Sequence, residues 1–468
     1  MHTLILRPND VLFFRDGRPM SGSLSGHGTA WPAPTVFHAA LHAALWRAGF
    51  ANQHYNSHGH GKGDIRKFGS VVTTGPFPVC VGDDEKIQSN PKSHTWFFPR
   101  PLDSNPSFPN EDQKTPLALL PSQRVTCDDS SLVEPLEYGV ASVLPPSKSQ
   151  GEGNWWNRAA YDAYLGHSAN IKQAKSAKDE DVADHEHQIG IGIDPATQTT
   201  GQGEAEGKIY SAQYLRLRDC WRLGCLAGGL DKEFIEENGD LISALFCRDG
   251  ETIVVGGNQR VCSVTLHPKL SPLPLPMGMK DKFNCQNEKY LVKWVLLTPS
   301  VWPEISDKDA DGNQKFDQNG QPIQTHTGGW LPNWIDPKDG QVLLKSGDTK
   351  RGEGEGRERW RKRVRSMSHI DAKLVAAVIG KPQTITGWAL ADKLTGREEG
   401  AKSTHLAVIA GAVYYFECES ATDAQALANA LNWHGDTGGT EIRNRRSTLY
   451  GEKGFGLGVC GTWSFYGE

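Results

Sequence analysis

Short apolar runs separated by turn-forming residues characterise the first part of the chain. Residues 4–6 and 11–14 are apolar and strand-like, and a polar turn at 7–10 separates them. Residues 36–49 carry Ala, Leu and Trp on one apolar face and predict a helix, with Thr35 as its N-cap. Two loops rich in His, Gly, Pro, Ser and Asn are expected next, near residues 50–68 and 83–115.

A β-hairpin arm is predicted further along the chain. Residues 188–194 are extended, residues 195–207 are polar, and residues 208–219 alternate in the manner of a strand. Together they indicate two long strands joined by a polar tip. The elements expected after this arm are a helix over 231–246 and a strand over 251–266, interrupted at Gly256-Gly257-Asn258-Gln259.

The second half repeats this mixture of strands and helices. The segments expected, in chain order, are a Pro-rich connector at 268–276, a strand over 290–297, a polar insertion near 304–356, a helix over 371–379, strands over 384–391 and 406–418, a helix over 422–433, and a glycine-rich loop with a last strand over 451–465. Each half therefore combines strands with two amphipathic helices, which indicates an α+β fold. The simplest unit of this kind is the ferredoxin-like split βαβ.

The length of the chain favours two domains. A chain of 468 residues exceeds what one ordinary core organises. We expect two ferredoxin-like domains, over residues 1–270 and 288–468, with a linker at 271–287, long loop insertions and the hairpin arm.

Composition limits the partners and the compartment. The net charge of −5 excludes a uniformly basic surface, so any nucleic-acid contact must be a local patch. No leader and no run of 18 apolar residues is evident, so we expect a cytoplasmic protein without a membrane partner. The nine Cys form no CxxC pair and are interpreted as reduced core thiols.

Two patterns resemble metal sites only in part. Asp307, Asp309 and Asp311 match the first half of a calcium-binding loop, but its twelfth position is Gln318, so weak or absent calcium binding is expected. His38 and His42 are four residues apart but lack the Glu of a zinc protease, so they are interpreted as packing or surface histidines. We expect no metal and no cofactor.

Three glycine- and arginine-containing segments are candidates for holding phosphates. The first is a tight turn with a following segment of small donors, and its candidate residues are Arg15, Arg18, Ser21, Ser23 and His27. The alternative for this segment is a structural turn in which Arg15 pairs with a carboxylate.

The second candidate is the turn formed by Gly256, Gly257, Asn258 and Arg260, where glycine permits close approach of a backbone. A plain hairpin turn or β-bulge is its alternative. The third lies near the C-terminus, and its candidates are Arg443, Arg445, Arg446, Lys453, Gly454, Gly456 and Gly458. There, a dinucleotide fingerprint is excluded because only seven residues follow it. The alternative for this third segment, a purely structural loop, also stays open.

A basic run lies at residues 357–365, where six cationic residues surround Trp360. Charge with an interleaved aromatic residue suits a single-stranded nucleic acid. The alternative is a solvated helix face neutralised by the preceding Gly-Glu repeats.

Several of these segments resemble one known family. Residues 10–19 and 31–35 resemble the opening of the third subunit of type III-B (Cmr) CRISPR effector complexes, a RAMP protein with RRM-like units. Residues 189–210 are similar to the arm of that family. The turn at 256–260 is similar to its GGE-x-R turn, with Asn258 in place of the acidic residue, and residues 454–458 are similar to its glycine-rich loop.

The resemblance implies a non-catalytic scaffold that binds the 5′ repeat-derived tag of a CRISPR RNA. The implied partners are that RNA, the large polymerase/cyclase-like subunit and the backbone RAMP subunit. The arm would act as a thumb that presses on the guide RNA, by shape because its tip has no net positive charge. Two alternatives stay open: a metal-independent endoribonuclease using His27, and a tag-binding subunit of another type III or type I complex.

Overall fold

The computed structural model describes most of the chain with side chains. The described residues are 1–15, 24–26, 29, 31–48, 71–82, 90, 93–104, 120–122, 132–141, 153–166, 173–194, 196–200, 209–228, 239–247, 251–309, 313–349, 351–352, 354–389, 398 and 400–466. The loops expected near 50–68 and 83–115 fall largely outside these ranges.

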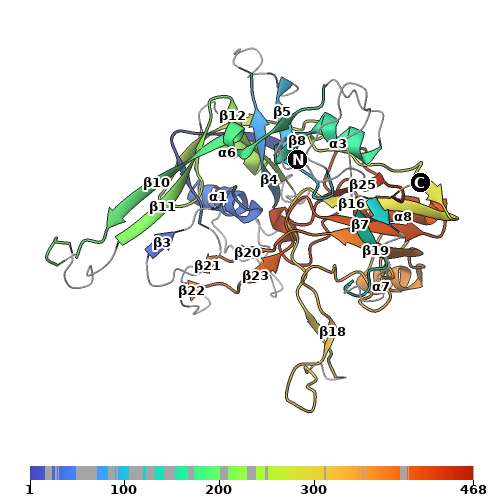
Figure 1. The fold of residues 1–468 in the computed structure, drawn as a ribbon. Coiled ribbons are helices and arrows are strands. Elements are labelled where there is room, and N and C mark those ends of the chain that lie inside the picture. The colour runs from blue at the N-terminus through green and yellow to red at the C-terminus, as the bar shows by residue number, and fades with distance from the viewer. Residues whose placement is uncertain are drawn as a thin grey trace.

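An eight-stranded sheet organises the N-terminal half (Figure 1). Its strands, in spatial order, are β13 (Thr252–Val254), β14 (Val261–His267), β1 (His2–Pro8), β12 (Trp221–Gly228), β4 (Val72–Cys80), β5 (Thr95–Pro99), β8 (Trp155–Asn157) and β9 (Ser176–Ala177). Strand β1 pairs antiparallel with both β14 and β12. The strand expected over 251–266 is therefore a hairpin, with β13 and β14 on either side of the 256–260 turn.

Strand β1 is buried on both faces, which explains its continuous apolar run. Leu4 and Leu6 pack into a core beneath helix α1 (Pro34–Arg47), whereas Ile5 packs into a second core shared with the C-terminal half. Helix α1 begins with Pro34 after Ala33, and no side chain caps it. The prediction of Thr35 as the N-cap is wrong, because Pro34 has a fixed φ that suits the first helical position and starts the helix one residue earlier, which places Thr35 inside the first turn.

Three shorter helices accompany this sheet: α3 (Arg158–Leu165), α4 (Asp179–Val182) and α6 (Leu241–Leu245). Asp240 caps α6 by accepting hydrogen bonds from the amides of Ile242 and Ser243. The helix expected over 231–246 is thus confirmed only at its end, and residues 231–238 lie outside the described part.

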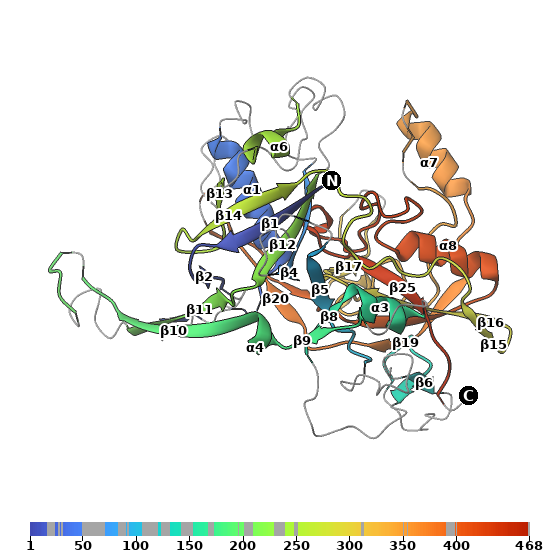
Figure 2. The same ribbon diagram turned by 90° about the horizontal axis from the view of Figure 1, so that it is seen from above.

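The predicted arm is present and projects from the body (Figures 1 and 2). Its strands β10 (Ala183–Ile191) and β11 (Ile209–Leu217) pair antiparallel over their whole length. At its base β11 also pairs with β2 (Leu12–Phe13), and further out with β3 (Leu24–Gly26). The side chains of Ile189, Ile191 and Ile193 are 77%, 55% and 63% exposed.

A five-stranded sheet organises the C-terminal half. Its strands are β15 (Asn284–Gln286), β16 (Lys289–Leu296), β24 (Val413–Cys418) and β19 (Ala372–Val378), with β25 (Gly458–Thr462) on β16. Helix α8 (Ala421–Leu431) covers it, capped by Ser420, and buries Leu427 and Leu431. Strand β16 and helix α8 confirm the predictions for 290–297 and 422–433.

One predicted helix is wrong. The segment 371–379, expected to be a helix, instead contains strand β19 (Ala372–Val378), which pairs with β24 and places Leu374 opposite Phe416. The run Leu374, Val375 and Ala376 is buried on both faces, so it has no alternation that would distinguish a strand from a buried helix.

The insertion near 304–356 is polar and exposed only in part, and another part of it belongs to the core. It contains the two-stranded ribbon β17 (Ile305–Ser306) and β18 (Gln324–His326), which projects from the body in Figure 1. Leu331, Ile335 and Val342, in contrast, belong to the core under the C-terminal sheet.

The remaining described elements are helix α7 (Arg357–Ser366), the short pairs β6 (Leu120–Ser122) with β7 (Gly139–Ala141), β20 (Gln383–Ile385) with β23 (His405–Ala407), and β21 (Trp388–Ala389) with β22 (Gly400–Ala401), and the 3-10 turn η4 (Gly451–Lys453). The result is a mixed fold of helices and mainly antiparallel sheets. Among the described residues, no helix is long and apolar enough to cross a membrane.

A buried polar network joins the two halves. Asp103 accepts hydrogen bonds from the hydroxyls of Tyr164 on α3 (2.6 Å) and Tyr415 on β24 (2.6 Å). Lys293 on β16 lies with its Nζ 3.5 Å from the centroid of the Tyr164 ring. Burial raises the pKa of Asp103 and lowers that of Lys293 to about 8, although the opposite charges oppose both shifts.

The two large sheets have the same internal strand order. In the first, the strands β1, β4, β12 and β14 stand side by side as β14-β1-β12-β4. In the second, β16, β19, β24 and β25 stand as β25-β16-β24-β19. Each order places the fourth strand next to the first and the third next to the second.

Candidate nucleic-acid interface

The 256–260 turn docks on the strand that precedes Arg15. The amide of Gly257 donates to the carbonyl of Phe13 (2.9 Å). Gly256 has φ +79°, and a Cβ there would lie 2.5 Å from the Phe13 carbonyl oxygen, so this position requires glycine. Asn258 and Gln259 also have positive φ, as the central residues of a type I′ hairpin turn do. Two segments far apart in sequence thus meet here.

Two contacts hold Arg260 at this junction, and a third holds its partner Tyr214. Its guanidinium carbon lies 5.0 Å from the centroid of the Tyr214 ring, and its Nη1 lies 3.2 Å from Oδ2 of Asp10. The side-chain amide of Asn258 donates to the Tyr214 hydroxyl (3.0 Å). The turn, strand β11 and the β1–β2 connection therefore fix one arginine in place.

A second arginine shares the same carboxylate. Arg216 contacts Oδ1 of Asp10 (3.1 Å) and also pairs with Glu186. The amide of Val11, together with Arg216 and Arg260, lowers the pKa of Asp10. Asp10 and Arg216 are about half exposed. Because these pairs are open to water, they cost little to exchange for a phosphate.

The first candidate segment begins at this cluster. Arg15 is exposed and follows Phe14, whose ring lies against Gly256. The amide of Thr29 donates to the carbonyl of Phe14 (3.1 Å), so the chain returns to the same point. Four of the candidates, Arg18, Ser21, Ser23 and His27, lie outside the described residues.

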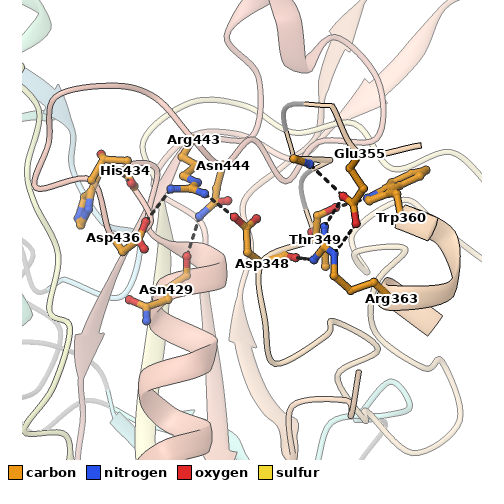
Figure 3. A network of polar contacts seen from close by, with 12 residues as sticks. Asp348, Thr349, Glu355, Trp360, Arg363, Asn429, His434, Asp436, Arg443 and Asn444 are labelled. Atoms are coloured by element: carbon orange, nitrogen blue, oxygen red, sulfur yellow. Dashed lines mark hydrogen bonds and ion pairs between the residues drawn. The ribbon is translucent and has the colours of Figure 1, made fainter. Parts of the chain in front are cut away.

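The arginines of the third candidate segment have partners within the protein. Arg446 is partly buried, and its Nε donates to the carbonyl of Ala430 near the end of α8 (2.7 Å). Arg443 pairs with Asp436 (2.9 Å) and Asp348 (2.7 Å), as Figure 3 shows. These contacts correspond to the structural alternative, and RNA contact by these side chains stays a prediction.

Arg445 is also largely buried. Among the described residues its Nε and one Nη have no hydrogen-bond partner. Burial lowers the pKa of Arg445 and of Arg446 to about 10. Both side chains therefore remain charged at neutral pH.

The glycines of this loop are required by close packing. A Cβ on Gly454, which has φ +94°, would lie 2.7 Å from the carbonyl oxygen of Thr73 on β4. A Cβ on Gly456 would lie 2.1 Å from the amide nitrogen of Ser447, and one on Gly458 would lie 2.3 Å from Nε1 of Trp294. The loop thus packs tightly on the protein. Lys453 is partly buried, with its Nζ 4.6 Å from the centroid of the Tyr450 ring.

The third segment is nevertheless a neighbour of the first two. The amide of Thr29 is bonded to the carbonyl of Phe14, and Ala33 packs against the small apolar cluster that contains Phe455 of the glycine-rich loop. The four residues from Thr29 to Ala33 span at most about 14 Å, so these two contacts lie near each other. The turns therefore gather in one region rather than on unrelated faces.

Three residues of the cluster, Asp10, Tyr214 and Arg216, were not among the predicted site residues. Alternation along 208–219 does place Tyr214 and Arg216 on the same face of a strand. The pattern does not indicate that Asp10, about 200 positions earlier, lies between Arg216 and Arg260. That relation depends on the pairing of β11 with β2.

The metal-like patterns form no site in the described part of the chain. No group of three or more His, Cys, Asp or Glu residues there could hold a metal ion. Asp307 pairs with Lys315 (2.9 Å), while Asp311 lies outside the described residues. His38 and His42 stack at 4.1 Å between ring centroids, and His38 shares a hydrogen bond with Thr73, so both are packing residues.

The fold and the site together define a protein of helices and mainly antiparallel sheets. At the base of its projecting arm lies a cluster of arginines, Arg15, Arg216 and Arg260. The chain belongs to the family of the CRISPR-associated protein (Cas_Cmr3), whose model matches residues 4–463. This confirms the family expected from the sequence. No curated protein matches the chain.

Three solved structures contain chains with partial likeness. A chain of the type III-B Cmr-beta complex bound to cognate target RNA and AMPPnP has 13% identity, covers 88% of this chain and 86% of its own, and gives a TM-score of 0.34. A chain of Cmr-beta bound to cognate target RNA has 12% identity, covers 97% of this chain and 95% of its own, and gives a TM-score of 0.36. A chain of the type III-A Csm3-Csm4 subcomplex has 11% identity, covers 88% of this chain and 92% of its own, and gives a TM-score of 0.32.

Proposed function

We propose that this chain is a non-catalytic, RNA-binding scaffold subunit of a type III-B CRISPR effector complex. It would hold the 5′ tag of the CRISPR RNA at the base of the arm. Membership of the Cas_Cmr3 family supports this class. The observation that carries the site is the junction at which the amide of Gly257 bonds to the carbonyl of Phe13, two residues before Arg15.

The proposed mechanism is binding without chemistry. Arg15 and Arg260 neutralise phosphates, and the exposed turn over residues 256–259 presents its backbone to the RNA. The exposed isoleucines of the arm, Ile189, Ile191 and Ile193, act by shape and apolar contact with the bases. Asp10 pairs with both Arg216 and Arg260 and keeps their guanidinium groups ordered until the phosphate binds.

The scaffold itself would consist of two ferredoxin-like units. The shared strand order of the two large sheets supports this. The position of the helices along the chain also supports it, because α1 lies between β1 and β4, and α8 lies between β24 and β25. In the complex, the chain would contact the large polymerase/cyclase-like subunit and the backbone RAMP subunit in the cytoplasm.

The test compares tag-RNA binding by the wild-type chain and by an Arg15→Ala/Arg260→Ala double variant. We expect weaker binding and a plot of log affinity against log salt whose slope falls by about 1.4 for a single strand. The matched control, Lys338→Ala/Lys381→Ala, removes two exposed cations elsewhere and should leave the slope unchanged. Unchanged affinity and slope in the first double variant would overturn the proposed site.

The non-catalytic part is tested separately with repeat RNA in metal-free buffer. Intact RNA is expected. Specific cleavage that disappears in His27→Ala would establish the endoribonuclease alternative instead.

A further inference from the structure

Helix α7 is a cationic element that projects from the C-terminal half, at the opposite end of the molecule from the arm (Figures 1 and 2). It carries six cationic side chains and one anionic side chain, and none of its residues is buried. Most of these cations are exposed to solvent, namely Arg357, Arg359, Arg361, Lys362 and Arg365. A chain with a net charge of −5 thus concentrates positive charge on about two and a half exposed helical turns.

The helix is anchored by polar contacts instead of an apolar face. Arg363 forms a two-pronged ion pair with Glu355, in which Nε–Oε1 and Nη2–Oε2 are both 2.9 Å. Nη1 of Arg363 also donates to the carbonyl of Asp348 (2.5 Å), and Nε1 of Trp360 donates to the carbonyl of Thr349 (2.8 Å), as seen in Figure 3. Hydrogen bonding to Arg363 lowers the pKa of Glu355 to about 2, so the anchor is charged at physiological pH.

The same anchor is continuous with the body of the protein. The side chain of Asp348 pairs with Arg443, which in turn pairs with Asp436 just beyond the end of α8 (Figure 3). This relay fixes the rotation of α7 about its own axis. Trp360, Arg363 and Val364 face the body. At 100° per residue, Arg361, Lys362 and Arg365 lie on the opposite, outer face together with one carboxylate, Glu358.

The outer face is not arranged as an ordinary solvated helix. Arg357, Arg361 and Arg365 follow one another at i, i+4 spacing, and like charges at that spacing destabilise a helix by about 0.2–0.5 kcal/mol per pair. A solvated helix gains stability from alternating charges, but Glu358 is the only carboxylate within α7, and its i, i+3 and i, i+4 spacing to Arg361 and Lys362 offsets only part of the repulsion. A polyanion bound along this face would remove the repulsion.

The composition favours phosphates over an acidic protein surface. Five of the six cations are arginine, whose planar fork matches phosphate oxygens in a bidentate manner. Successive arginines on the outer face are about 6 Å apart along the axis, which suits a continuous backbone of charges. We propose that the outer face of α7, where Arg361, Lys362 and Arg365 surround the single carboxylate of Glu358, is a contact surface for the sugar–phosphate backbone of RNA, separate from the arm base.

The test uses the full chain with three exposed cations of α7 neutralised, R361Q/K362Q/R365Q. Glutamine retains helix propensity, and circular dichroism and a thermal melt verify the fold. The probe is a labelled RNA of about 20 nucleotides that lacks any tag sequence, used as a single strand and annealed to its complement. We expect binding at 0.1 M salt to weaken at least 10-fold and the single-strand salt slope to fall by about 2.

A matched variant, K308Q/K338Q/K381Q, removes three exposed cations from other loops and should bind like the wild-type chain. A loss confined to one form of the probe identifies that form as the ligand. Equal affinities of the α7 variant and the wild-type chain for both probes would overturn the inference. So would a loss of binding to poly-glutamate with RNA binding intact, because the partner would then be an acidic protein.

This surface does not depend on the tag-binding proposal. The Arg15→Ala/Arg260→Ala variant should retain the α7-dependent binding of tag-free RNA. The α7 variant should in turn retain the difference in affinity between tagged and untagged RNA. Failure of one proposal is therefore visible without failure of the other.

Discussion

Arg260 lies over the ring of Tyr214, with its guanidinium carbon 5.0 Å from the ring centroid, although the two residues come from different hairpins. The contact forms because the 256–260 turn rests on strand β2, and β2 in turn pairs with the strand that carries Tyr214. The ring therefore orients the arginine on which the proposed RNA site depends. Tyr214 is itself buried, so its role is to position Arg260.

Two substitutions of Tyr214 separate its ring from its hydroxyl. Tyr214→Phe removes the hydrogen bond from Asn258 and should cost about 1 kcal/mol of stability while RNA affinity stays within about two-fold. Tyr214→Leu also removes the cation–π contact, worth about 0.5–1 kcal/mol, and should weaken tag-RNA binding about 3- to 5-fold. Fluorescence anisotropy and thermal melts measure both effects. Equal losses of affinity in the two variants would contradict a positioning role for the ring.

The buried pair formed by Asp103 and Lys293 predicts a pH dependence of stability. Burial lowers the pKa of Lys293 to about 8, so between about pH 8 and 10.5 the unfolded chain binds a proton that the folded chain has lost. Stability from this group therefore rises with pH in that window, by about 1 kcal/mol per pH unit. Urea unfolding at pH 7, 8 and 9 should show this rise relative to Lys293→Met, in which the contribution is absent. A constant difference between the two proteins would contradict it.

Removing the carboxylate of that pair should be more harmful than removing the lysine. Asp103→Asn leaves a buried cation without its counter-charge, and such a change costs roughly 3–5 kcal/mol. It also leaves the hydroxyls of Tyr164 and Tyr415 with a weaker acceptor. The Asp103→Asn/Lys293→Met double variant should recover much of the loss, as denaturant midpoints will show. If it is no more stable than Asp103→Asn alone, the two residues are not coupled.

Local patterns predicted the elements whose signals are local. Strand β16 and helix α8 have unambiguous periodicity, and the turn at Gly256 has the residue types that a hairpin needs. Strand β19 was mistaken for a helix because its identity is decided by its partner β24, more than 30 residues away. The ion pairs from Asp10 to Arg216 and Arg260 likewise depend on sheet register, which no local window contains.

The glycine-rich loop illustrates a different limit. Arginines among glycines have the composition of a phosphate-binding loop, and this motivated the prediction for Arg445 and Arg446. Composition does not reveal which way a side chain points. Here Gly454 brings the loop against Thr73 of β4, and Arg446 reaches the end of α8.

Gly454 and Gly438 form a matched pair for testing that packing. Both have positive φ, but a Cβ on Gly454 meets main-chain atoms of Thr73 and Thr74 at 2.7 Å, whereas nothing lies within 4 Å of one on Gly438. Gly438→Ala should therefore cost only the left-handed strain, about 1–2 kcal/mol. Gly454→Ala should cost roughly 3 kcal/mol or more because backbone atoms must also move. Denaturant unfolding that gives equal losses would show that the loop does not pack on β4 as described.

Arg446 offers the sharpest choice between a structural role and RNA contact. Its Nε bonds to the carbonyl of Ala430, and its own carbonyl accepts a hydrogen bond from Nε1 of Trp302. Arg446→Ala should therefore lower stability by roughly 1–3 kcal/mol, since it leaves the Ala430 carbonyl unsatisfied at the end of α8. RNA affinity, measured well below the melting temperature, should keep its salt slope. A slope that falls by about 0.7 would instead show that Arg446 neutralises a phosphate, because each such contact contributes that amount for a single strand.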